Sequence, residues 1–302
     1  MSLATPVIVQ VSDIHLSRSH AWFIDNWRVF LDEMDELQPD LVILTGDVSF
    51  NGPDAPEDLA FAAEEIARLP GEVLVLPGNH DIGEPAACLR LDQPVDEQRL
   101  ARWRALFGPD WWCRDVAGWR LVGLDSELLG SGLAAEDEQW GFLETALADG
   151  SSPVALFLHR PLFLAAPDEP TTPSNVPLAP RLRLLGLLEQ GDVRLVASGH
   201  LHEYRSTRHE GAAIVWAPGT SFVNPGKARP GRRGIRRSGY LIHDLSGRRP
   251  RHRFVQPGLF ANIDLSNFTA RTGTTIKLPP RPLARQDDRP AAAGLRLAGT
   301  LR

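Results

Sequence analysis

The chain has 302 residues, a formal net charge of −6, 43% hydrophobic residues and 23% charged residues. These values are ordinary for a globular protein and exclude a wholly disordered or fibrous chain. No apolar run approaches the roughly 18 residues that a membrane span needs, and no basic stretch precedes an apolar one at the N-terminus. The only cysteines are Cys88 and Cys113, so a disulfide framework is excluded and we expect free thiols and a cytoplasmic protein.

Charge is distributed unevenly along the chain. Residues 1–226 hold 15 basic and 34 acidic side chains, a net charge of −19, whereas residues 227–302 hold 17 and 4, a net charge of +13. The basic part can complement the acidic part, within the chain or between copies in a homo-oligomer. It can also meet an anionic substrate, a nucleic acid or a membrane surface. The acidic body argues against an extended nucleic-acid groove, and a membrane surface is the weakest of these interpretations.

Apolar runs and helical periodicity alternate along the chain. Strands are predicted at Val7–Val11, Leu41–Leu44, Val73–Leu76, Trp119–Leu124, Val154–Leu158 and Val193–Ala197. Helices are predicted at Trp22–Leu37, Pro56–Leu69, Arg99–Phe107, Glu136–Ala148 and Arg181–Glu189. This alternation predicts an α/β fold with a largely parallel sheet.

The pattern changes after His202, where tight turns join short apolar or alternating runs. Strands are predicted there at Tyr204–Arg208, Ala212–Trp216, Gly239–Asp244 and His252–Val255, and we expect them to extend a second sheet. We place one domain at residues 1–268. Residues 269–302 are basic and rich in Pro and Ala, which predicts a loosely ordered tail.

Five of the predicted strands end in polar residues that can bind metal ions. Their ends read Asp13-Ile14-His15, Gly46-Asp47, Gly78-Asn79-His80-Asp81, His159 and Gly199-His200-Leu201-His202. In α/β sheets, ligands bind beyond the carboxyl ends of the strands. The strand end at Asp125–Glu127 is a weaker candidate for lining the same cleft. The other histidines, among them His243, are interpreted as surface or packing residues.

The spacing of these residues has a chemical meaning. In an extended backbone, residues i and i+2 point to the same side, so Asp13 and His15 can reach one ion, and His200 and His202 a common site. Carboxylate, imidazole and amide donors without a thiolate suit Mn, Fe or Zn. The candidates outnumber the ligands of one tetrahedral ion, which predicts two ions that share a carboxylate.

As an ordered set, these five blocks resemble the calcineurin-like metallophosphoesterase family, and most closely its branch with class III cyclic-nucleotide phosphodiesterases. The family pattern is D-x-H, G-D, G-N-H-D/E, H and G-H-x-H, and every block is intact here. The resemblance covers roughly residues 7–220. It implies a four-layer α/β/β/α sandwich of two mixed sheets flanked by helices, with two metal ions between the sheets.

The resemblance also implies a role for each residue. The first ion would be held by Asp13, His15, Asp47 and His202, and the second by Asp47, Asn79, His159 and His200. His80 would stabilise or protonate the leaving oxygen, and Asp81 would orient His80. A hydroxide that bridges the two ions would attack a small phosphodiester, such as a cyclic nucleotide or a glycerophosphodiester.

Two other functions remain open at this stage. The chain could be a phosphomonoesterase that acts on a phosphoprotein or a metabolite. It could also be a non-catalytic scaffold, although the intact ligand blocks and His80 argue against that interpretation.

Overall fold

The computed structural model describes residues 6–89, 92–148, 150–224, 234–265 and 278–284. Its strands are β1 (Ile8–Val11), β2 (Leu41–Thr45), β3 (Glu72–Leu76), β4 (Trp112–Val116), β5 (Trp119–Leu124), β6 (Val154–Leu158), β7 (Val193–Ser198), β8 (Arg205–His209), β9 (Ala212–Trp216), β10 (Tyr240–Asp244) and β11 (Arg251–Val255). Its helices are α1 (Ile24–Leu37), α2 (Pro56–Ile66), α3 (Asn79–Ile82), the 3-10 turn η1 (Ala86–Cys88), α4 (Glu97–Phe107), α5 (Ala134–Ala148) and α6 (Leu178–Leu188).

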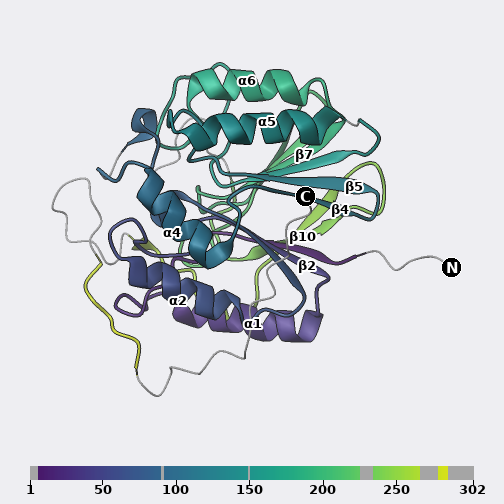
Figure 1. The fold of residues 1–302 in the computed structure, drawn as a ribbon. Helices are drawn as coiled ribbons and strands as arrows, with labels where there is room; N and C mark the ends of the chain where they lie inside the picture. Colours follow the sequence, from purple (N-terminus) through teal and green to yellow (C-terminus); the bar gives the residue numbers. More distant parts are fainter. Residues whose placement is uncertain (1–5, 90–91, 149, 225–233, 266–277, 285–302) are drawn as a thin grey trace.

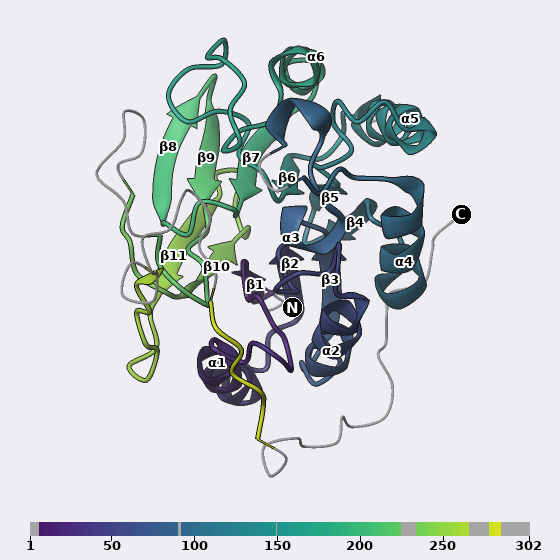
Figure 2. The same ribbon diagram turned by 90° about the vertical axis from the view of Figure 1, so that its left-hand side faces the viewer.

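Two mixed sheets lie face to face between layers of helices, as the predicted α/β/β/α sandwich requires (Figures 1 and 2). The first sheet has the order β11-β10-β1-β2-β3, and the second has the order β4-β5-β6-β7-β9-β8. In Figure 1, α5 and α6 cover the second sheet at the top, and α1 and α2 cover the first sheet at the bottom.

The inner strands are almost continuously apolar because both of their faces are covered, whereas the edge strands β4, β8 and β11 are polar and partly exposed. Successive residues of β2 alternate between two cores: Leu41 and Ile43 point between the sheets, and Val42 and Leu44 point toward the helices. In β6, Phe157 lies between the sheets and Leu156 lies under α5 and α6. The sandwich therefore has three apolar layers, and the carboxyl ends of its central parallel strands gather along one edge.

The last strands correct part of the prediction. β8 and β9 do extend the second sheet, but β10 and β11 join the first, where β10 pairs antiparallel with β1 through Ile8 and His243. The prediction that all four later strands extend the second sheet was therefore wrong for β10 and β11. The alternation of residues within a strand does not specify which strand it pairs with. The sequence analysis also missed β4, which pairs antiparallel with β5 at an edge and is half-exposed.

The tail prediction is wrong for residues 278–284, and the rest of the predicted tail lies outside the described residues. The Arg281 amide donates to the Ser19 carbonyl at 2.9 Å, and the Ala21 amide donates to the Arg281 carbonyl at 2.9 Å. Leu278 is buried in a small apolar cluster with Phe23. This segment therefore packs against the loop before α1, and the domain does not end at residue 268.

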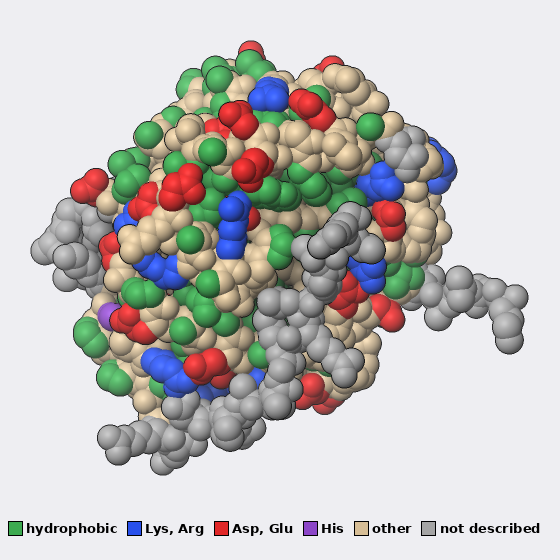
Figure 3. Space-filling view, in the orientation of Figure 1, with side chains coloured by type: hydrophobic (Ala, Val, Ile, Leu, Met, Phe, Trp, Pro, Cys, Tyr) green, Lys and Arg blue, Asp and Glu red, His purple; other side chains and the backbone are tan. Residues whose placement is uncertain are grey.

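Several basic residues of the C-terminal part pair with acidic residues of the body. Arg248 contacts Asp192 at 2.7 Å, and Arg236 contacts Glu203 at 3.4 Å. Figure 3 shows red and blue side chains intermixed on the visible face. The described residues thus support complementarity within one chain. Both cysteines are free, as predicted.

The described residues contain no helix that is both long enough and apolar enough to cross a bilayer.

A polar pair of the first sheet lies in the largely apolar layer between the sheets. His243 on β10 is 1% exposed, its Nε2 lies 3.0 Å from Gln10 Oε1, and its ring meets Phe157 of the other sheet edge to face. Burial, and then the charge of His252, lowers the pKa of His243 to about 3. His243 is therefore a packing residue that stays neutral in the folded protein.

This burial predicts an acid sensitivity. Between its ordinary pKa of 6.5 and about 3, His243 takes up a proton in the unfolded chain but not in the folded one. Stability from this residue is therefore complete above pH 6.5 and is lost as the pH falls toward 3. We expect it to contribute about 2 kcal/mol less to the unfolding free energy at pH 5 than at pH 7. Urea unfolding of His243→Gln should show a correspondingly flatter pH dependence, and equal slopes in both proteins would contradict the prediction.

Candidate metal centre

All seven predicted metal ligands lie in loops that directly follow strands. Asp13 and His15 follow β1, Asp47 follows β2, Asn79 begins α3 after β3, His159 follows β6, and His200 and His202 follow β7. Each is buried, with at most 9% of its surface exposed. Because the carboxyl ends of these strands in both sheets meet at one edge, residues far apart in sequence come together there. Figure 2 shows α3 near the centre of this region.

The first group of ligand atoms surrounds His202. Its Nε2 lies 3.2 Å from Asp13 Oδ1 and 3.3 Å from His15 Nε2. His15 Nε2 in turn lies 3.7 Å from Asp47 Oδ2. The ligand atoms of Asp13, His15 and His202 all lie within 4.8 Å of one another.

The second group surrounds His159. Its Nε2 lies 3.3 Å from Asp47 Oδ2, 3.3 Å from Asn79 Oδ1 and 3.1 Å from His200 Nδ1. Asp47 Oδ2 therefore faces a histidine of each group. These groups contain the residues of the two ligand sets that the family resemblance implied, and a third group, of His15, Asp47 and His80, also has its ligand atoms within 4.8 Å of one another.

The hydrogen bonds of three rings turn one nitrogen outward to a backbone carbonyl and the other inward to the ligand groups. His159 Nδ1 contacts the Thr45 carbonyl at 2.7 Å, and His202 Nδ1 contacts the Phe222 carbonyl at 2.9 Å. His200 Nε2 contacts the Pro173 carbonyl at 2.8 Å. Since a carbonyl only accepts, each outward nitrogen is a donor, and the inward nitrogen is the one that can bind a metal ion once it carries no proton. The inward lone pairs then face one another and the carboxylates, an arrangement that a cation stabilises.

Electrostatics also favour positive charge at this place. Burial raises the pKa of Asp47, but the charges of His159 and His80 outweigh burial and hold this pKa well below its usual range. Burial lowers the pKa of His159, and the Asp47 carboxylate then raises it to about 10. Because the same field attracts a proton and a metal ion, the two compete for this nitrogen, and metal binding releases the proton.

The loops that carry the candidate ligands are not extended. The alternation of side chains along a strand therefore does not explain the i, i+2 spacing of these residues. Asp13, His15, Asp47, His200 and His202 all have positive φ values, between 46° and 68°. This left-handed conformation costs of order 1–3 kcal/mol per residue outside glycine. The expected extended backbone was therefore wrong, although Asp13 and His15 do lie in one ligand group, as predicted. His200 faces His159, whereas His202 faces Asp13 and His15.

His80 lies beside the two groups, and its ring meets that of His15 edge to face at 4.7 Å. Its amide donates to Asp47 Oδ1 at 2.8 Å, and its Nδ1 faces the Phe50 carbonyl at 2.8 Å. The proton on Nδ1 therefore points to Phe50, and Nε2 is the nitrogen left for a substrate.

Asp81 does not orient the His80 ring, contrary to the prediction. Its carboxylate accepts from the amides of Val48, Ser49 and Gly78 at 2.8–3.1 Å, and from the Ser49 hydroxyl at 2.7 Å. Asp81 thus joins the loop after β2 to the start of α3. It supports the backbone that carries Asp47 and His80.

The prediction that Asp125–Glu127 lines the cleft was also wrong. Asp125, Ser126 and Glu127 are fully buried, and Glu127 pairs with Arg160. Sequence reasoning missed Arg160, and it missed the carbonyls of Thr45, Pro173 and Phe222 that orient the histidines. A carbonyl leaves no signal in a sequence, because every residue has one.

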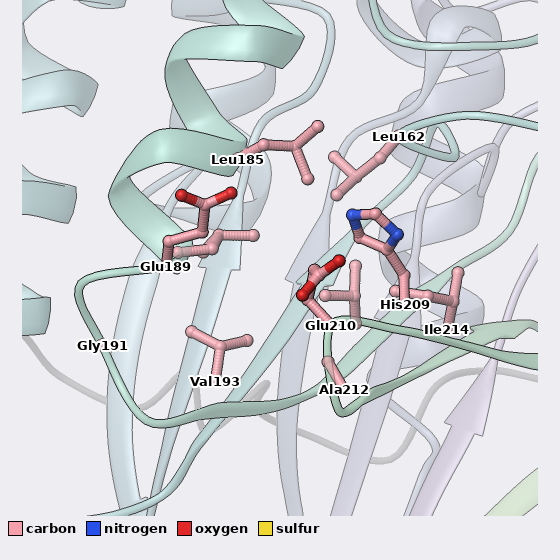
Figure 4. Close-up of a pocket in the computed structure, with 11 residues that line it drawn as sticks. Leu162, Leu185, Glu189, Gly191, Val193, His209, Glu210, Ala212 and Ile214 are labelled. Carbon is pink, nitrogen blue, oxygen red and sulfur yellow. The ribbon is translucent and has the colours of Figure 1, made fainter. Parts of the chain in front are cut away.

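A separate hollow of about 230 Å³ lies under α6, where apolar residues such as Leu185 and Val193 meet Glu189, His209 and Glu210 (Figure 4). None of the residues that line it is a predicted ligand.

The family is established by comparison with known proteins. The family model described as calcineurin-like phosphoesterase matches residues 6–204. The chain belongs to this family, as its motifs indicated, and is a phosphoric ester hydrolase.

Curated relatives include two types of phosphoesterase. The chain is 28% identical over 241 residues to the glycerophosphodiester phosphodiesterase GpdQ of Enterobacter lignolyticus, covering 72% of this chain and 79% of the relative. It is 27% identical over 239 residues to the serine/threonine-protein phosphatase CPPED1 of Danio rerio, covering 68% and 73%.

Solved structures show the same fold. A purple acid phosphatase from yellow lupin matches with a TM-score of 0.62 and 16% identity, over 83% of this chain and 52% of that chain. A dimetal phosphatase from Danio rerio matches with a TM-score of 0.55 and 14% identity, over 82% and 98%. These neighbours confirm the two-sheet sandwich.

The closeness of the ligand loops predicts that Gly78 tolerates no side chain. A Cβ at Gly78 would lie 2.5 Å from the Asp47 amide and 2.8 Å from His159 Nε2. We expect Gly78→Ala to lose most bound metal, measured by elemental analysis of the purified protein. The control is Gly186→Ala on α6, where a Cβ meets nothing within 4 Å. It should retain metal and gain up to about 1 kcal/mol of stability. Unchanged metal content in Gly78→Ala would contradict this reading of the site.

Proposed function

We propose that this protein hydrolyses small phosphodiesters, such as cyclic nucleotides or glycerophosphodiesters, at a centre of two Mn, Fe or Zn ions. The ligand sets are Asp13, His15, Asp47 and His202 for one ion, and Asp47, Asn79, His159 and His200 for the other. The observation that carries the proposal is the position of Asp47 Oδ2, which faces His15 Nε2 at 3.7 Å and His159 Nε2 at 3.3 Å.

Bound ions would supply Lewis acidity and an activated water nucleophile. The chain itself supplies orientation and a proton. His80 is fixed through its amide by Asp47 and through Nδ1 by the Phe50 carbonyl. In its charged form the ring also carries a proton on Nε2, and this proton can pass to the departing alkoxide without a rearrangement of the ring.

The choice of a diester rests on the relatives. GpdQ is named for a glycerophosphodiester, and a relative from Synechococcus, 28% identical over 175 residues, is named a probable cyclic nucleotide phosphodiesterase. The similarity to CPPED1, named a protein phosphatase, favours phosphomonoesterase activity as the second candidate. Intact ligand groups and His80 argue against a non-catalytic scaffold.

A substrate comparison separates the two candidates. With Mn²⁺ added, we expect kcat/KM for bis-p-nitrophenyl phosphate to exceed that for p-nitrophenyl phosphate by at least tenfold. A chelator should abolish both activities, and Mn²⁺, Fe²⁺ or Zn²⁺ should restore them. A preference for the monoester would favour the phosphatase, and no turnover with either ester would favour the scaffold.

The role of His80 predicts a selective defect. His80→Ala should lower kcat by about 10²–10⁴-fold, because the departing oxygen loses its proton donor. Both ions should stay bound, because His80 belongs to neither ligand set. Asp47→Ala should instead lose metal from both sets. Metal analysis shows the difference, and loss of an ion from His80→Ala would overturn the assigned role.

A further inference from the structure

A fully buried arginine directly follows one of the ligands. Arg160, next to His159, is 0% exposed. Its Nη2 contacts Glu127 Oε2 at 2.7 Å, and its Nε contacts Glu127 Oε1 at 3.3 Å. This two-point contact fixes the plane of the guanidinium as well as its position. The backbone amide of Arg160 donates to the Ser126 hydroxyl at 2.9 Å, so the residue is held at both ends.

The same guanidinium reaches the group that orients His200. Arg160 Nη1 donates to the Pro173 carbonyl, and this oxygen also accepts from His200 Nε2 at 2.8 Å. Two donors therefore share one carbonyl. The position of that oxygen determines the direction in which His200 Nδ1 points, toward His159 Nε2 at 3.1 Å.

A third contact reaches the segment behind Asn79. Arg160 Nη2 lies 3.6 Å from Glu84 Oε1, and Glu84 is 1% exposed. Glu84 follows α3 by two residues, and its backbone is hydrogen-bonded to Gln93 and Val95. One buried cation thus contacts the segment that follows Asn79, lies next to His159 in the chain, and reaches His200 through the carbonyl of Pro173. Among the described residues, no hydrogen bond or ion pair joins this guanidinium to Asp13, His15 or His202.

We propose that Arg160 is the positioning residue of the second half of the centre, and that it aligns Asn79, His159 and His200 for one of the two ions. This inference rests on the two-ion proposal above. It predicts that weakening Arg160 lowers the affinity for one ion and leaves the other nearly unchanged. Loss of an outer partner of a metal ligand typically costs about 10–100-fold in affinity.

Two variants test the inference. Arg160→Lys keeps the charge but cannot contact Glu127, Glu84 and Pro173 together. The triple variant Arg160→Met with Glu127→Met and Glu84→Gln removes all three charges, and it should fold because uncharged residues of similar volume often replace buried ionic groups at little cost. The matched control is Arg114→Lys. Arg114 also makes a two-point contact, with Glu72 at 2.9 and 3.1 Å, at the opposite end of β3 from Asn79.

The measurement is a Mn²⁺ titration of the metal-free full-length protein by calorimetry, with thermal unfolding followed in parallel. We expect two ions in the wild type and in Arg114→Lys. In both Arg160 variants we expect one ion of unchanged affinity and a second weakened by about 10–100-fold. A folded Arg160 variant with two wild-type affinities, or with both weakened equally, overturns the inference. A wild type that binds one ion or none instead overturns the two-ion proposal, so the two failures are distinguishable.

Discussion

The buried Asp47 carboxylate lies close to histidines from both sheets of the protein. Its Oδ2 atom lies within 3.7 Å of His15 from the first sheet and within 3.3 Å of His159 from the second. Bringing carboxylates and imidazole lone pairs together without water is costly unless positive charge compensates. Folding therefore brings carboxylates and imidazole nitrogens together at a cost in free energy. The binding of cations offsets that cost. Alignment of the sheets at this edge is consequently linked to metal binding.

Hydrogen bonds between the sheets reinforce this alignment. The Thr45 carbonyl at the end of β2 accepts from His159, which follows β6, and Asp13 Oδ2 accepts from the His200 amide at 3.0 Å. Elsewhere the layer between the sheets is largely apolar, and apolar contact alone is not directional. Polar contacts at the ligand edge thus give the sandwich its register, while the apolar layers give it most of its stability.

The core strands and the candidate ligands could be predicted from the sequence because both depend on the identity of side chains. The core strands appear as apolar runs because they are covered on both faces, and each candidate ligand is a His, Asp or Asn at a strand end. The backbone conformation of the loops and the pairing of the strands were harder to predict from the sequence. The left-handed backbone of Asp13 and His200 depends on loop contacts with other segments. The edge strand β4 alternates between half-buried and exposed residues, so its hydrophobic signal is weak. The pairing of β10 with β1 joins segments more than 200 residues apart.

In both ligand groups, a buried charged residue directly follows one of the histidines. Arg160 comes directly after His159 and pairs with Glu127, and Glu203 comes directly after His202 and lies 3.4 Å from Arg236. Exposed pairs such as Arg251 with Asp244 contribute at most about 1 kcal/mol and do not fix geometry. A fully buried charge behaves differently, because breaking its pair leaves an uncompensated charge and costs about 3–5 kcal/mol. A loop anchored in this way cannot rotate cheaply, so the neighbouring imidazole keeps its direction when the ion dissociates. The charges beside the ligands therefore help to keep the centre preorganised for binding.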